Sequence, residues 1–255
     1  MSRSASGNSL PGSGTSIRGF VFDGVGFSET NLSPLAIGVR SRVGANDLVV
    51  HSNTFLGGGF GLFIRGDRVQ VTHNVFYGFT VLLSPDPRFN GFGGAAIEDD
   101  GLPPRFFGAG RVTGNIQFNA ITTTVPPGDY SSVSYTSEVD VPVVGISLTG
   151  QDGTIISNNK FSITSNAHGD AGAGVIAFDF YGLTDINLGI TNNDGRGSQY
   201  ALIVTNDQGG GTGNSVGLAL RGNFGVNLIN GSTFNVGNRS ISTLLECDPT
   251  TGVCQ

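Results

Sequence analysis

The sequence predicts an all-β solenoid of about eight or nine coils, and three observations lead to that prediction. Short stretches of alternating apolar and polar residues recur along the chain, as in "GLFIRG" (61–66) and "GISLTG" (145–150). A second apolar step then ends in Asn with Phe close behind, as in "VQVTHNVF" (69–76). Charged residues make up only 13% of the chain, which disfavours long surface helices with charged outer faces.

The alternating stretches predict one strand in each coil, because a period of two residues is that of a β-strand. Glycine brackets most copies, as sharp corners require. The predicted strands cover 17–24, 37–44, 61–66, 94–101, 145–150, 174–180, 201–207 and 217–222.

The Asn-containing step predicts a second strand and a turn, and it recurs at roughly twenty residues or about twice that. We expect the Asn side chains to be structural, because Asn tolerates left-handed backbone angles and can bond the next Asn; a ligand role is the alternative. The step occupies 48–55, 69–76, 112–118 and 154–161, with looser copies at 186–194 and 226–234. Its turn residues are Asn53, Asn74, Asn115 and Asn159, and its core ladder is Phe55, Phe76, Phe118, Phe161 and Phe234.

One such unit cannot bury its apolar face, whereas units stacked in register bury a continuous core. We therefore expect a single domain over 17–240, with a flexible lead-in at 1–16 and an end piece at 241–255. Stretches rich in Pro, Gly, Ser and Thr predict insertions near 84–110 and 122–143, lying over one flank.

The two ends of the chain carry their own expectations. Turn residues between Cys247 and Cys254 favour a disulfide, which indicates an oxidising, extracellular or cell-surface location; two free thiols are the alternative. No amphipathic capping helix is evident, although solenoid ends expose strand edges. A shortened chain, a homo-oligomer through the uncapped ends, or a cap of another kind would each account for this.

Composition disfavours several classes of function. The net charge of −6 gives no reason to expect nucleic-acid binding. No apolar run approaches the length of a membrane span. No Cys/His cluster suggests structural zinc, so no metal site or cofactor is assigned.

The pattern of Gly-apolar-x-apolar followed by apolar-x-x-Asn-x-Phe resembles the repeat of the pectate-lyase-like superfamily, over roughly residues 17–240. The resemblance implies a single-stranded right-handed parallel β-helix. Many members of that superfamily are secreted enzymes that act on polysaccharides, and others are adhesins, phage spikes or surface proteins. The fold alone does not decide among them.

The predicted strands, aligned on their leading Gly, place charged residues in columns that we expect to face solvent. The fifth position holds Asp23, Arg42, Arg65, Glu98, Thr149 and Arg221. The third position holds Val21, Arg40, Phe63, Ala96, Ser147 and Ala219. Arg42 and Arg65 would then lie on adjacent coils and repel each other, unless Glu98 or an anion from solution lies between them.

These columns suggest a site for an acidic or polyhydroxyl sugar chain. Arg65 and the substrate-binding candidates Arg42 and Arg40 would engage carboxylates, beside Phe63 and the two Pro-Arg-Phe arginines, Arg88 and Arg105. Glu98, Asp99 or Asp100 would act with Arg65 in acid/base catalysis, or would offer hard oxygen atoms to Ca²⁺. The alternative is a solvated face with an incidental Arg–Glu pair.

Two classes of function stay open on the sequence. The first is an extracellular polysaccharide-interacting protein, with lyase or hydrolase activity as one form of it. The second is a non-catalytic structural or adhesive solenoid, which the lack of a complete catalytic signature favours. His51 and His73 precede the Asn turns, where packed imidazoles are expected in preference to a site.

Overall fold

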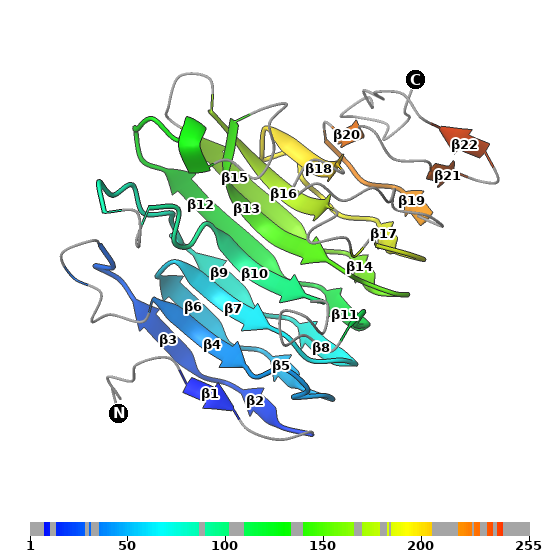
Figure 1. The fold of residues 1–255 in the computed structure, drawn as a ribbon, viewed down its shortest axis with the longest axis horizontal. Helices are drawn as coiled ribbons and strands as arrows, with labels where there is room; N and C mark the ends of the chain where they lie inside the picture. The colour runs from blue at the N-terminus through cyan, green and yellow to red at the C-terminus, as the bar shows by residue number, and fades with distance from the viewer. Residues whose placement is uncertain are drawn as a thin grey trace.

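The computed structural model describes residues 8–10, 14–28, 31, 36–86, 90–101, 110–133, 140–165, 170–178, 183, 185–205, 219–225, 227–229, 234–236 and 239–241. They form an all-β structure with three parallel sheets, compatible with a parallel β-solenoid (Figure 1). The helical part of these described residues is one 3-10 turn, η2 (Ser131–Val133). The all-β, parallel character expected from the sequence is confirmed.

Each sheet is a stack of short strands, and we call the three sheets A, B and C. Sheet A contains β1 (Asn8–Leu10), β4 (Ile37–Ser41), β7 (Phe60–Ile64), β10 (Ala95–Asp100), β13 (Asp140–Thr149), β16 (Asp170–Phe178), β18 (Tyr200–Thr205) and β20 (Asn227–Ile229). Sheet B contains β2 (Ser16–Arg18), β5 (Val49–His51), β8 (Val69–Thr72), β11 (Gly114–Gln117), β14 (Ile155–Ser157), β17 (Gly189–Thr191) and β19 (Ala219–Arg221). Sheet C contains β3 (Val21–Gly24), β6 (Thr54–Gly57), β9 (Val75–Tyr77), β12 (Ala120–Val125) and β15 (Lys160–Ser165).

The chain visits the three sheets in turn, and each circuit is called a coil below. β4, β5 and β6 lie in A, B and C, and β7, β8 and β9 pair with them in parallel one coil on. β4, β7, β10, β13 and β16 therefore run side by side in Figure 1. A separate antiparallel pair is formed by β21 (Phe234–Val236) and β22 (Arg239–Ile241).

Aromatic rings and glycines face each other inside the stack. The rings of Phe22, Phe55 and Phe76 stack in sheet C, with centroids 4.7 and 4.6 Å apart. Sheet A leaves room for them: a Cβ added to Gly61 would lie 2.5 Å from Phe76. Glycine is therefore required at position 61, the second residue of β7, by the Phe76 ring opposite it.

The expected phenylalanine ladder is wrong in part. Ile121 follows Phe76 in register, and Phe161 then pairs with Ile121. Phe118 lies at a corner, 49% exposed, with a φ of 57°. Phe234 lies on β21, outside the parallel sheets. The sequence alignment used Asn115 as the turn residue of the coil that contains β11 and β12, whereas the structure has Asn119 there, four residues later.

A buried ladder of asparagines lies at the corner between sheets B and C. The side-chain oxygen of each Asn after the first accepts a hydrogen bond from the backbone N–H of the Asn one coil before, at 2.9–3.2 Å. The Asn53 side-chain oxygen accepts from the backbone N–H of Phe20 at 3.0 Å. The ladder consists of Asn53, Asn74, Asn119, Asn159, Asn193 and Asn223. The structural role expected for these side chains is confirmed, with Asn119 in place of Asn115, which lies on β11.

The described parts of the two insertions touch each other. In the first, Val81 and Gly93 form an antiparallel bridge that brings Phe92 back toward the coils. The Asn90 side chain donates to Ser132 Oγ in the second, at 3.4 Å. Within the lead-in expected at 1–16, residues 8–10 form β1, which pairs with β4.

Candidate functional site

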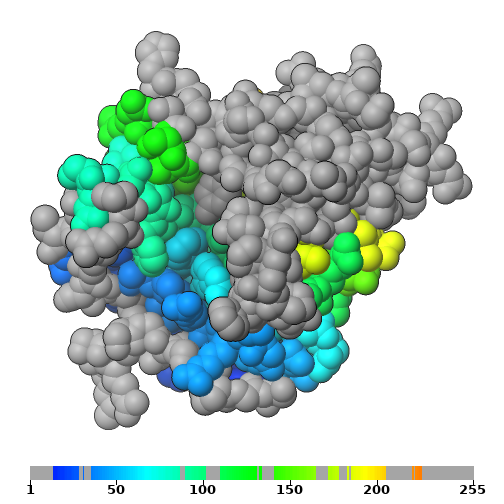
Figure 2. All heavy atoms as spheres, viewed as in Figure 1, coloured from blue at the N-terminus to red at the C-terminus, as the bar shows by residue number. Residues whose placement is uncertain are grey.

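The outward face of sheet A carries one column of polar and aromatic side chains across four strands. Arg40, Phe63, Glu98 and Ser147 are level with one another on β4, β7, β10 and β13. Arg40 is exposed, Phe63 and Glu98 are half-buried, and Ser147 is buried. The face is therefore open over β4 and β7, and atoms in their blue to cyan colours are uncovered in Figure 2.

In the expected column of Arg42, Arg65 and Glu98, the place of Glu98 is wrong, whereas the pairing of Arg40 with Phe63 keeps Arg42 level with Arg65. Ala95 pairs with Phe60, so Ala96 and not Gly94 is level with Gly61. The register therefore places Asp100 beside Arg65, and Asp100 pairs in turn with Thr149. Asp23 on β3 and Arg221 on β19 belong to sheets C and B, and so lie outside the column.

Two arginines flank Phe63. Arg65 Cζ lies 4.6 Å from the centroid of the Phe63 ring, and Arg40 Cζ lies 5.6 Å from it. Both distances are within the range of a cation–π interaction. Phe60 packs edge-on against Phe63 at 5.4 Å, and Phe92 from the first insertion packs against Phe60 at 5.5 Å. We call these five residues the Phe63 cluster.

Arg65 also faces a buried carboxylate. Its Nε lies 3.8 Å from Asp100 Oδ2, beyond hydrogen-bonding distance, and Nε has no hydrogen-bond partner. The Asp100 side chain is 9% exposed and that of Arg65 is 27% exposed. Burial raises the pKa of Asp100 and Arg65 lowers it, with a net value of about 6. Arg65 and Asp100 therefore form no hydrogen-bonded ion pair through Nε, and Arg65 offsets only part of the effect of burial on the Asp100 pKa.

Asp99 points to the other side of β10, into the core, where it is 0% exposed. Neither carboxyl oxygen has a hydrogen-bond partner, although the Gln151 amide is near enough to lower the pKa slightly. Burial, followed by the charges of Asp100 and Asp185, raises the pKa of Asp99 well above its usual range. Burial therefore favours the uncharged form of Asp99, and its side chain, inside the core, cannot reach a ligand in solvent.

The three acids named as candidates for catalysis or Ca²⁺ binding do not converge on one site. The successive residues Glu98, Asp99 and Asp100 are half-buried, wholly buried and nearly buried, and Asp99 faces away from the Phe63 cluster. In the part of the chain that the structure describes, no three His, Cys, Asp or Glu residues are grouped to hold a metal ion. The expected catalytic or Ca²⁺-binding group is not assembled there.

The remaining arginines differ in how they are bonded. Arg42 is exposed in the turn after β4, and no carboxylate among the described residues pairs with Arg42 or Arg40. Arg88 and Arg105 lie outside the described residues, as do Cys247, Cys254 and His168.

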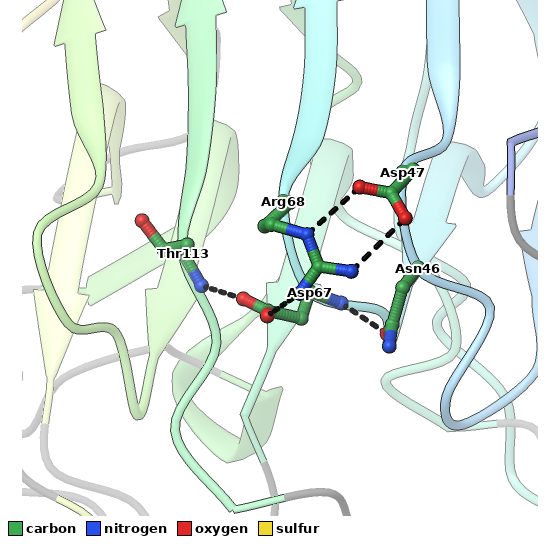
Figure 3. A network of polar contacts seen from close by, with 5 residues as sticks. All are labelled: Asn46, Asp47, Asp67, Arg68 and Thr113. Atoms are coloured by element: carbon green, nitrogen blue, oxygen red, sulfur yellow. Dashed lines mark hydrogen bonds and ion pairs between the residues drawn. The ribbon is translucent and has the colours of Figure 1, made fainter.

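Arg68 shows the opposite case, an arginine already bonded within the fold (Figure 3). It donates two hydrogen bonds to Asp47, at 2.8 and 2.9 Å, and one to Asp67 at 2.7 Å. The hydrogen bond from Arg68 lowers the pKa of Asp47. Asp67 also accepts from the backbone N–H of Thr113, so the network joins the corners of successive coils. Arg68 is therefore a structural residue.

The two histidines pack at the corner, as the favoured interpretation of the sequence expects. The rings of His51 and His73 lie 5.1 Å apart, and His73 stacks on Phe118 at 5.1 Å. His51 Nδ1 lies 2.9 Å from Thr72 Oγ1. His73 and Phe118 occupy left-handed positions, with φ of 58° and 57°.

Sequence reasoning missed two members of the Phe63 cluster, Phe60 and Phe92. Phe60 directly precedes the leading Gly61, and that position faces outward on sheet A. Phe92 lies in an insertion, so no periodic pattern marks it. The pairing of Arg65 with Asp100 could be found only by aligning Ala96 with the leading glycines.

Comparison of the chain with protein-family models, with curated proteins and with solved structures finds no match. In the described ranges, no helix has the length and apolar character needed to span a membrane. The Phe63 cluster and its surroundings are therefore the evidence for a function.

Proposed function

We propose that this protein binds an acidic polysaccharide over β4, β7 and β10 on the outer face of sheet A. The observation that carries the proposal is the half-buried Phe63 ring between two arginines, at 4.6 and 5.6 Å, on an open part of that face. Guanidinium groups bind carboxylate or sulfate in a bidentate manner. A sugar chain can meet several such groups at once, because neighbouring strands of a sheet lie about 4.8 Å apart.

The charge distribution supports a polyanion at this place despite the net charge of −6. Arg40 and Arg42 are exposed and pair with no carboxylate among the described residues, whereas Arg68 is held by two aspartates. Arg40 and Arg42 are thus free to meet an anionic ligand, whereas Arg65 also faces Asp100. The low overall charge density disfavours nucleic acid as that ligand.

Because the repeat resembles that of the pectate-lyase-like superfamily, we also propose that the chain belongs to that superfamily. We propose that it forms a right-handed solenoid of about eight or nine coils and that it is extracellular or at the cell surface. Association of copies through the ends is also proposed, because β2 and β3 each have only one paired neighbour among the described strands.

Binding without cleavage is the form that the geometry favours. Asp99 is in the core and Asp100 is nearly buried beside Arg65, so the cluster offers no pair of accessible carboxyl groups. An adhesive solenoid that holds a polysaccharide is therefore preferred to a hydrolase or lyase. Release of reducing ends or of unsaturated products from the bound polymer would overturn this preference.

The test is a binding titration of polygalacturonate and dextran sulfate, with neutral dextran as a control. Arg40→Ala should weaken binding about tenfold, as expected when a charged contact is lost. Phe63→Ala should also weaken binding, because its ring contacts both guanidinium groups. Arg196→Ala is the matched control, because Arg196 lies 5.4 Å from the Phe224 ring and is paired with Asp194 elsewhere on the surface. Absence of binding, or equal losses in Arg40→Ala and Arg196→Ala, would refute the proposal.

A further inference from the structure

We propose that Asp100 sets the affinity of the Phe63 cluster by competing with the bound polyanion for Arg65. This inference rests on the proposed function and names the residue that tunes the same site. It predicts that wild-type protein at neutral pH binds less tightly than the arginines of the cluster would allow.

The geometry gives Arg65 two partners at once. Its guanidinium carbon lies 4.6 Å from the Phe63 ring, and its Nε lies 3.8 Å from Asp100 Oδ2. Nε makes no hydrogen bond, so the ion pair is not closed. A sulfate or carboxylate that engages the exposed part of Arg65 would lie near the Asp100 charge, and like charges at such distances repel.

Asp100 cannot easily turn away from an incoming anion. Its side chain is 9% exposed, and its neighbour Thr149 on β13 is uncharged and fully buried. On its own strand, Glu98 is half-buried and Asp99 lies in the core. Asp67, on the corner beyond β7, is bonded to Arg68. Arg65 is thus the one cation paired with Asp100 among the described residues.

Acidification should remove the competition. Burial raises the pKa of Asp100 to about 6 although Arg65 opposes the shift. The carboxylate is therefore charged at about pH 7.5 and mostly neutral at about pH 5. Affinity for a ligand that stays charged over this interval should rise as the pH falls.

The experiment measures the dissociation constant of dextran sulfate at pH 7.5 and pH 5 in the same salt concentration, because sulfate groups stay charged at both. Asp100→Asn should bind about fivefold more tightly than wild type at pH 7.5, the change expected from one weak charge pair. Wild type should gain about the same factor on going to pH 5, and Asp100→Asn should gain much less.

Asp194→Asn is the control, because it removes the same charge from another Arg–Asp pair, with Arg196 at 2.9 Å. It should bind as wild type does at both pH values. Binding by Asp100→Asn equal to wild type, or a wild-type affinity that does not change with pH, would overturn the role of Asp100 while leaving the site intact. If Asp100→Asn does not fold, the wild-type dissociation constants at pH 7.5 and pH 5 still test the role of Asp100. Failure of every protein to bind at either pH would instead refute the proposed function, and this inference with it.

Discussion

Asn119→Ala should be among the most destabilising single substitutions in the corner between sheets B and C. Asn119 Oδ1 accepts from the backbone N–H of Asn74 at 2.9 Å, and Asn119 Nδ2 donates to the Val71 carbonyl at 2.9 Å. Alanine removes both hydrogen bonds, which leaves the buried N–H of Asn74 unsatisfied and takes one hydrogen bond from the Val71 carbonyl. At roughly 1–3 kcal/mol for the orphaned N–H and about 1 kcal/mol for the second hydrogen bond, the loss should be about 2–4 kcal/mol in the free energy of unfolding.

Asn115→Ala is the matched control for this prediction. Asn115 is the same residue type in the same coil, half-buried on β11, and its side chain makes no hydrogen bond within the described part of the chain. Its replacement should change stability by less than about 0.5 kcal/mol. Equilibrium unfolding in urea measures both variants. Equal losses, or a larger loss for Asn115→Ala, would show that the ladder does not pass through Asn119.

Two other predictions concern the core and the buried acids. Gly61→Ala should lower the free energy of unfolding by about 1–3 kcal/mol in the same urea assay, because the added Cβ would lie 2.5 Å from Phe76. Gly189→Ala is the control and should be near neutral, because its Cβ would have no atom nearer than 3.8 Å. Asp100 has a folded pKa of about 6, above its ordinary 3.8, so it adds stability below about pH 4 that is lost as the pH rises through 6. Wild type should therefore lose up to about 3 kcal/mol relative to Asp100→Asn between pH 4 and 7.5; parallel pH profiles would contradict this.

The repeat in the sequence was enough to predict parallel coils but not their division into three strands. The segment 48–55 was expected to hold one strand and a turn, and it contains β5 and the start of β6. The corner between them uses a left-handed residue, Ser52, with a φ of 53°. Because the equivalent residues His73 and Phe118 are bulky, no glycine marks this corner in the sequence.

The register of β10 limited the prediction of the site. Gly94 and Ala96 are both small, and the sequence alone does not show which of them faces the core ring. The pairing of Ala95 with Phe60 settles it and moves Glu98 from beside Arg65 to beside Phe63. Arg40, Phe63 and Arg65 were correctly expected to lie near one another, because they belong to adjacent repeats. The inward direction of Asp99 follows from strand alternation once that register is known.

Hydrogen–deuterium exchange with and without dextran sulfate tests whether the polymer lies across β4, β7 and β10 of sheet A. Residues 37–41, 60–64 and 95–100 lie side by side on sheet A, although they are far apart along the chain. We predict that the polymer slows exchange in these three segments together and leaves β14 and β17 of sheet B unchanged. Slower exchange in only one of the three segments, or slowing confined to sheet B, would contradict the account.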